Sequence, residues 1–120
     1  MTRTEFTGQR DLTFSGWIRK ELPDSSLGFM VTDLDFILYN WNTKKVILLE
    51  VKTRNKQLTV WQNNIFQNLS KWINKGIDKD WTFLGFKIIR FENTFFNDGK
   101  CYLNNKEISE QELKIFLGKI

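Results

Sequence analysis

The stretch KVILLEVK, residues 45–52, decides the fold because four consecutive aliphatic residues lead directly into two charges. A run this apolar is typical of a buried strand. It ends at Glu50 and Lys52, with one valine between them. Side chains two positions apart on a strand point to the same face. The sequence therefore predicts a central strand that presents a carboxylate and an ammonium side by side at its end.

The regions on either side predict strands and helices in a mixed order. A helix is expected at 12–22, before Pro23, and residues 41–46 are expected to join two strands as a hairpin. Apolar residues then recur every three or four positions from 58 to 75, which indicates a long amphipathic helix. The five Trp fall mostly on such periodic positions and are expected in the core, Trp41 excepted. The other expected elements are brief strands at 28–30 and 33–40, a strand at 81–91, a hairpin turning at Asn104-Asn105, and a last helix opening with a capping box at Ser109.

This order predicts one α/β (α+β) domain over residues 1–120, with a mixed central sheet flanked by helices. Residues 1–10 are polar and expected to be ragged, the core spans about 11–91, and 92–120 form a C-terminal extension with the hairpin and last helix. The only cysteine, Cys101, excludes an internal disulfide, and no secretion signal or membrane-length apolar run is present. An intracellular, cytoplasmic protein that is not secreted is expected.

Charge and composition narrow the chemistry. The chain carries 18 Lys and Arg against 14 Asp and Glu and contains no His. The net charge of +4 permits an anionic partner such as nucleic acid without requiring one. Without histidine there is no Ser-His-Asp triad, no His-based zinc site and no imidazole base. An enzyme built from this chain must use carboxylates, lysines, arginines or a hard metal ion.

Glu50 and Lys52 form one of three acid-x-Lys triplets in the chain. The pattern alone is therefore weak evidence of a site, and its position in the fold is what distinguishes it. The other two, at 98–100 and 112–114, fall in a Gly-containing turn and on a helix. If the strands at 33–40 and 45–52 pair as a hairpin, Asp35 falls roughly opposite Glu50, with Asp33 nearby. Clustered carboxylates repel unless something neutralises them, and Mg²⁺ prefers such ligands. The alternative is a solvated sheet edge with an ordinary salt bridge.

A cation at this place would support phosphodiester hydrolysis. Mg²⁺ held by Asp35 and Glu50 would polarise the phosphodiester and make a water molecule more acidic. Lys52 would orient the attacking water and counter the charge that grows in the transition state. None of this needs histidine.

An acid at the start of one strand, Glu-x-Lys at the end of the next and a long helix afterwards resemble the PD-(D/E)XK nuclease superfamily. The resemblance covers about residues 11–91 and implies a restriction-endonuclease-like αβββαβ core. It implies Asp35 and Glu50 as metal ligands, the main-chain carbonyl of Val51 as a third, and Lys52 as the catalytic lysine. Gln62 matches a catalytic Gln that some members carry on the following helix. The Pro of the family's name is absent, since Leu34 precedes Asp35.

Other residues are secondary candidates with equally ordinary alternatives. Glu21 matches an acid that some members carry on the first helix, and Asp33 is either a supporting acid or a strand-entry residue. Arg54 and Lys56 are candidate phosphate contacts, or else solvate a loop. Trp41 sits in a predicted loop, where an exposed ring could stack on a base.

These observations predict a Mg²⁺-dependent nuclease, with Mn²⁺ able to substitute, acting on structured or branched DNA; RNA stays open. The resemblance includes Holliday-junction resolvases and other minimal nucleases, so a homodimer or a recruiting protein partner is expected, and no membrane. One alternative is a non-catalytic nucleic-acid-binding module with the same fold. Another is a protein-interaction domain whose acidic cluster is incidental.

Overall fold

A computed structural model of the protein describes residues 12–23 and 25–120. The described part is mixed α+β, with three α-helices and a five-stranded mixed sheet. The segment 1–10, expected to be ragged, lies outside the described residues. The chain divides into two compact units, Met1–Asp33 and Leu34–Ile120.

The first unit contains α1 (Thr13–Glu21) and the short 3₁₀ helix η2 (Ser25–Leu27). The helix predicted at 12–22 is confirmed, and its extended C-cap Leu22 precedes Pro23, as proline requires of the residue before it. The strand predicted at 28–30 is wrong. Gly28 takes a φ of 81°, a left-handed turn conformation, and among the described residues this segment has no partner strand. A segment of three residues without a ladder partner does not form a strand.

The second unit is built on one sheet with the strand order β1-β2-β3-β4-β5. The hairpin of β1 and β2 is antiparallel, as predicted, whereas β2 and β3 are parallel and joined through α2. A parallel pair needs such a crossover connection. The bounds are β1 (Phe36–Asn40), β2 (Lys45–Lys52), α2 (Val60–Gly76), β3 (Thr82–Phe91), β4 (Cys101–Leu103), β5 (Lys106–Glu107) and α3 (Glu110–Gly118).

The first strand of the hairpin begins at Phe36, three residues later than the predicted start. Continuing the register of Phe36 with Leu49 would place the carbonyl of Leu34 opposite Val51. The side chain of Asp35 takes that place instead, because its Oδ2 accepts the Val51 N–H at 2.8 Å. Asp is also a poor strand former. The ladder therefore ends where a side chain replaces the backbone acceptor.

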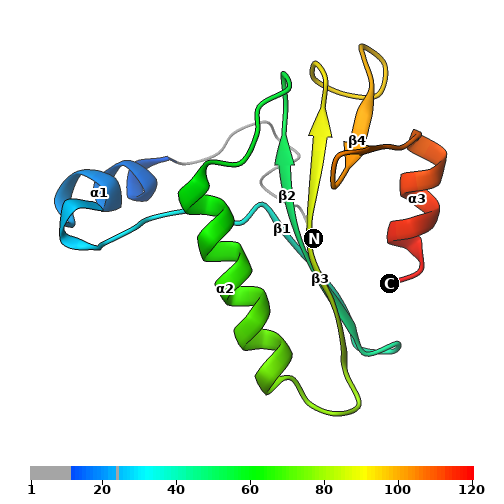
Figure 1. Ribbon diagram of the computed structural model, residues 1–120, viewed down its shortest axis with the longest axis horizontal. Coiled ribbons are helices and arrows are strands. Elements are labelled where there is room, and N and C mark those ends of the chain that lie inside the picture. Colours follow the sequence, from blue (N-terminus) through cyan, green and yellow to red (C-terminus); the bar gives the residue numbers. More distant parts are fainter. Residues whose placement is uncertain (1–11, 24) are drawn as a thin grey trace. The chain divides into compact units, whose positions relative to one another are not determined.

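The two faces of the sheet are covered by different helices, α2 on one side and α3 on the other (Figure 1). Ile47 and Leu49 of β2 pack with Ile89, Phe91 and Leu113 in the main core, against α3. The alternate residues face α2. There Leu48 is buried and its neighbour in the register, Phe86, stacks on Phe66 with ring centroids 4.3 Å apart.

The prediction of core positions for the tryptophans is wrong for Trp17, which is exposed, and for the two on α2. Trp61 and Trp72 are 61% and 60% exposed. The face of α2 that carries Phe66 packs against the sheet. Both Trp lie about 120° to 140° away from that face around the helix axis. The helical period predicted the helix but not which of its apolar residues are buried.

Local signals at the ends of elements are confirmed. Ser109 and Glu112 form the predicted reciprocal capping box at α3, and Thr59 and Gln62 form a second one at α2 that was not predicted. The turn of the last hairpin holds Asn104 and Asn105 at φ values of 49° and 69°. Positive φ at both central residues is the geometry that two-residue hairpin loops favour.

Candidate active site

The carboxyl groups of Asp35 and Glu50 meet at the end of the β1–β2 hairpin. Extending the strand register from Phe36 and Leu49 puts Asp35 opposite Glu50, as predicted. The backbone N–H of Val51 fixes Asp35, whose carboxylate lies close enough to Glu50 to raise the pKa of that carboxyl.

Glu50 is buried, with 4% of its surface exposed, beside the small core formed by Leu48, Phe66 and Phe86. Burial, followed by the hydrogen bond and the negative charge of Asp35, raises the pKa of Glu50 to about 8. The positive charge of Lys52 opposes this shift without cancelling it. The site thus favours a proton or another cation between the two carboxyls.

Lys52 is held by the beginning of α2. Its Nζ donates to Oε1 of Gln62 at 3.1 Å, and the same oxygen accepts the backbone N–H of Thr59 at 3.2 Å. The capping box therefore orients the amide that orients the lysine. In the described part of the chain, Lys52 makes no direct ion pair. The burial of Glu50 and the lack of an ion pair at Lys52 differ from a solvated sheet edge with an ordinary salt bridge.

The donor set suits a hard cation with few protein ligands. Across residues 12–23 and 25–120, no group of three or more His, Cys, Asp or Glu side chains forms a ready metal cage. Asp35 and Glu50 provide two carboxylates. The carbonyl of Val51 points to the same side of its strand as its N–H, toward Asp35. Mg²⁺ commonly binds one or two carboxylates and keeps its other positions for water and phosphate oxygens, so these residues fit it.

The secondary acids lie in the other unit. Asp33 accepts a hydrogen bond from Arg19 at 3.3 Å, so its carboxylate already has a cationic partner. Glu21 is the last residue of α1.

The predicted nucleic-acid contacts separate into two places. Arg54 and Lys56 are exposed in the turn directly after β2, so they follow the site along the chain. Trp41 is 71% exposed in the hairpin turn, at the opposite end of β2 from Glu50. The five residue steps along the strand from Lys45 to Glu50 span roughly 17 Å. The structure therefore does not bring Trp41 to the site.

Two polar residues at the site were not singled out from the sequence. Arg90 lies next to Lys52 in the parallel register of β2 and β3, and Asn55 accepts a hydrogen bond from its guanidinium. A signal was present. The strand at 81–91 ends its alternation of Phe86, Ile88 and Arg90 in a cation, much as 45–52 ends in Lys52.

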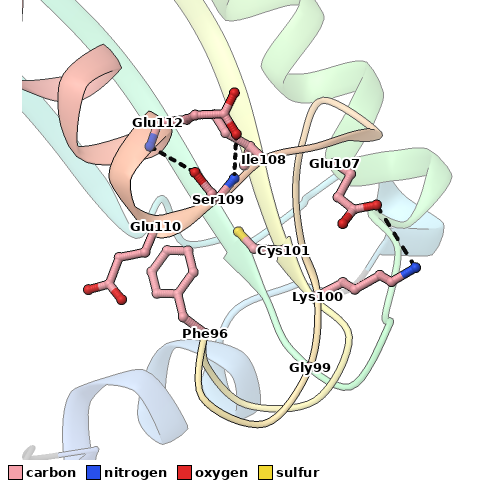
Figure 2. A pocket seen from close by; sticks show the side chains of 9 residues that line it. All are labelled: Phe96, Gly99, Lys100, Cys101, Glu107, Ile108, Ser109, Glu110 and Glu112. Carbon is pink, nitrogen blue, oxygen red and sulfur yellow. Dashed lines mark hydrogen bonds and ion pairs between the residues drawn. The ribbon is translucent and has the colours of Figure 1, made fainter.

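A cavity of about 540 Å³ lies away from these residues, and Figure 2 shows it at the start of α3. The carboxylate of Glu112 there is committed to the backbone N–H of Ser109 at 3.0 Å, and Lys100 lies 3.9 Å from Glu107. A smaller cavity of about 310 Å³ opens between the beginning of α2, Ile88 and Asn105. That second cavity is on the α2 face, the face that carries Glu50.

Comparisons of the chain with protein-family models, with curated proteins and with solved structures found no match. No helix in the described part of the chain is long and apolar enough to span a membrane.

Proposed function

We propose that this protein is a Mg²⁺-dependent nuclease that hydrolyses phosphodiester bonds in DNA, with structured or branched DNA as its substrate. The observation that carries this proposal is the convergence of Asp35, Glu50, Lys52 and Gln62. Asp35 lies close enough to Glu50 to raise the pKa of its carboxyl, and Lys52 donates a hydrogen bond to Gln62 beside them. A buried glutamate beside a second carboxylate and a lysine without an ion pair is costly to stability, and such perturbed groups concentrate at functional sites.

The arrangement of elements supports a PD-(D/E)XK-like assignment. A hairpin carries the acid and the Glu-x-Lys, a helix follows, and the next strand returns parallel to β2. One departure is that the described chain gives αββαβ up to Phe91, because no strand forms at 28–30. The assignment therefore rests on the hairpin, α2 and β3.

Some of these residues would bind the metal, and others would compensate the charge of the transition state. Asp35, Glu50 and the carbonyl of Val51 would hold Mg²⁺, which when bound polarises the phosphodiester and makes a water molecule more acidic. Lys52 places a positive charge where negative charge grows on the phosphate. Gln62 positions the ammonium of Lys52 through the 3.1 Å hydrogen bond. Mn²⁺ would substitute, because it also favours carboxylate, carbonyl and water ligands.

A direct test incubates the protein with four-way junction, single-stranded and duplex DNA and with RNA, each with Mg²⁺, with Mn²⁺ and with EDTA. We expect cleavage of at least one DNA substrate with either metal and none with EDTA. Glu50→Gln removes a metal ligand and should abolish cleavage. Glu110→Gln makes the same change on the exposed surface of α3 and should leave cleavage unchanged.

Failure to cut any substrate, or cutting that persists in both Glu50→Gln and EDTA, would sink the metallonuclease proposal. Binding of DNA without cleavage would favour the non-catalytic nucleic-acid-binding module instead. Cleavage of RNA alone would keep the reaction type and overturn the choice of DNA.

A further inference from the structure

Arg90 is a second cation on the face of the sheet that carries Glu50 and Lys52. In the parallel register Ile88 lies beside Glu50, and Arg90 lies beside Lys52. Adjacent strands run about 4.8 Å apart, and laterally paired residues point to the same face. The two cations therefore stand on neighbouring strands at the same level of the sheet.

The guanidinium of Arg90 is held in a fixed orientation. Its Cζ lies 4.2 Å from the centre of the Tyr102 ring, on the next strand. On its other side Nη1 donates to Oδ1 of Asn55. Contacts with an aromatic face and an amide oxygen restrict the planar group without neutralising it.

The turn that follows β2 places Asn55 for this contact. Arg54 and Asn55 both take left-handed conformations, with φ of 54° and 57°. The N–H of Arg54 donates to the carbonyl of Asn93 at 2.6 Å, and the N–H of Asn55 donates to that of Phe91 at 3.1 Å. The turn is thus bonded to the chain at the end of β3, and an asparagine tolerates the left-handed backbone. The segment that completes the Glu-x-Lys strand also orients Arg90.

The charge of Arg90 has no protein counter-ion within the part of the chain that the structure describes. Neither it nor Lys52 forms an ion pair there. Its Nε–H is also buried without an acceptor, which is uncommon for buried polar groups. Two neighbouring cations that form no ion pair in the described residues favour an anion between or beside them. A guanidinium, with donors arranged in a plane, matches the oxygens of a phosphate.

We propose that Arg90 is a phosphate-binding residue that holds a backbone phosphodiester of the nucleic acid beside Lys52. This inference rests on the proposed function for its ligand, but it concerns binding rather than bond cleavage. Arg90 would anchor the strand, Asn55 would act as its positioning residue, and Lys52 would face the reacting phosphate.

The test measures binding of a fluorescein-labelled four-way DNA junction in EDTA, over a series of KCl concentrations, by fluorescence anisotropy. Arg90→Met should weaken binding about tenfold or more, since a charge-assisted hydrogen bond is lost. It should also reduce the slope of log K against log salt by about 0.9, the value for one phosphate contact. Lys114→Met removes one charge from an exposed position on α3 and should change binding less than about twofold.

Two further variants separate charge from geometry. Arg90→Lys keeps the charge, so the salt slope should stay while affinity falls. Asn55→Gly permits the left-handed backbone and removes the amide, and it should weaken binding a few-fold without changing the slope. Circular dichroism establishes that each variant is folded. If Arg90→Met does not fold, Arg90→Lys decides, and wild-type affinity in that variant would contradict the proposal.

The outcomes distinguish this proposal from the proposed function. If wild-type protein cuts no DNA but Arg90→Met still loses affinity and slope, the nuclease reaction fails and the phosphate site stands. If wild-type protein cuts DNA and Arg90→Met binds normally, the nuclease stands and the phosphate site fails. Equal losses in Arg90→Met and Lys114→Met, or no DNA binding by the wild type, would also overturn the phosphate site.

Discussion

Two segments of this chain carry the same pattern, Glu-x-Lys, and behave in opposite ways. In β2, Glu50 is buried beside Asp35, and the pKa of its carboxyl is raised to about 8. At the start of α3, Glu112 is exposed, and hydrogen bonds from the backbone N–H and then the hydroxyl of Ser109 lower the pKa of its carboxyl. The letters are identical, and the surroundings decide the chemistry.

The difference follows from secondary structure. On a strand, residues two apart share a face, so Glu50 and Lys52 both turn to α2. On a helix, residues two apart do not face each other, and Glu112 turns back to cap the helix while Lys114 stays exposed. One acid completes a helix end. Glu50 lies next to the carboxylate of Asp35. Two negative charges at this place destabilise the fold unless a cation or a proton compensates them.

The largest expected effect contrasts the two lysines. Lys52→Ala should lower the rate of DNA cleavage about 100-fold or more, the usual loss when one group that stabilises transition-state charge is removed. Lys114→Ala makes the same change in the other triplet and should leave the rate unchanged. Single-turnover cleavage of a junction substrate with Mg²⁺ measures both. Equal cleavage rates in the two variants would show that Lys52 has no catalytic role that Lys114 lacks.

A second effect concerns the pH dependence of folding stability, which should have opposite signs for the two glutamates. The pKa of Glu50 is about 8 in the folded chain against an ordinary value of 4.5, so between these values the folded chain binds more protons than the unfolded chain. Stability must then fall as the pH rises, by up to about 1.4 kcal/mol per pH unit. We expect a loss of about 3 kcal/mol between pH 5 and 8, measured by urea unfolding in EDTA.

Two controls identify Glu50 as the source. Glu50→Gln has no proton to lose and should unfold at nearly the same urea concentration across this range. Adding Mg²⁺ to the wild type should also flatten the profile, because the bound cation takes the place of the proton. A wild-type profile as flat as that of Glu50→Gln would contradict the assigned protonation of the acid pair.

Much of the fold was predictable because its signals are local. The strand at 45–52 matches β2 to the residue, and the strand at 81–91 matches β3 to within one. Alternation, capping residues and Asn-Asn turns act over a few positions, so single-sequence patterns contain them. The meeting of Asp35 with Glu50 was predictable for the same reason, since a short hairpin fixes the register of its strands.

The parts that escaped prediction depend on distant or competing contacts. Arg90 reaches Lys52 only through a parallel pairing that spans α2, and Asn55 holds it from a left-handed turn. No local pattern encodes that distance. Trp61 and Trp72 fit the helical period but lie off the stripe that packs on Phe86, and only the sheet decides which stripe is buried. The later start of β1 arose from one side chain, Asp35, replacing a backbone acceptor.

The smallest expected effect belongs to Glu112 and has the opposite sign to that of Glu50. Its lowered pKa means that the stabilisation it provides is present above its ordinary value and is lost as the pH falls through the folded value. Glu112→Gln should leave stability at neutral pH nearly unchanged, because a Gln oxygen also serves in a capping box. It should remove part of the wild-type loss of stability below about pH 4.5, measured by thermal unfolding. A variant that loses stability in acid as the wild type does would show that the capping carboxylate is not the titrating group, and the contrast between the two triplets would then rest on Glu50 alone.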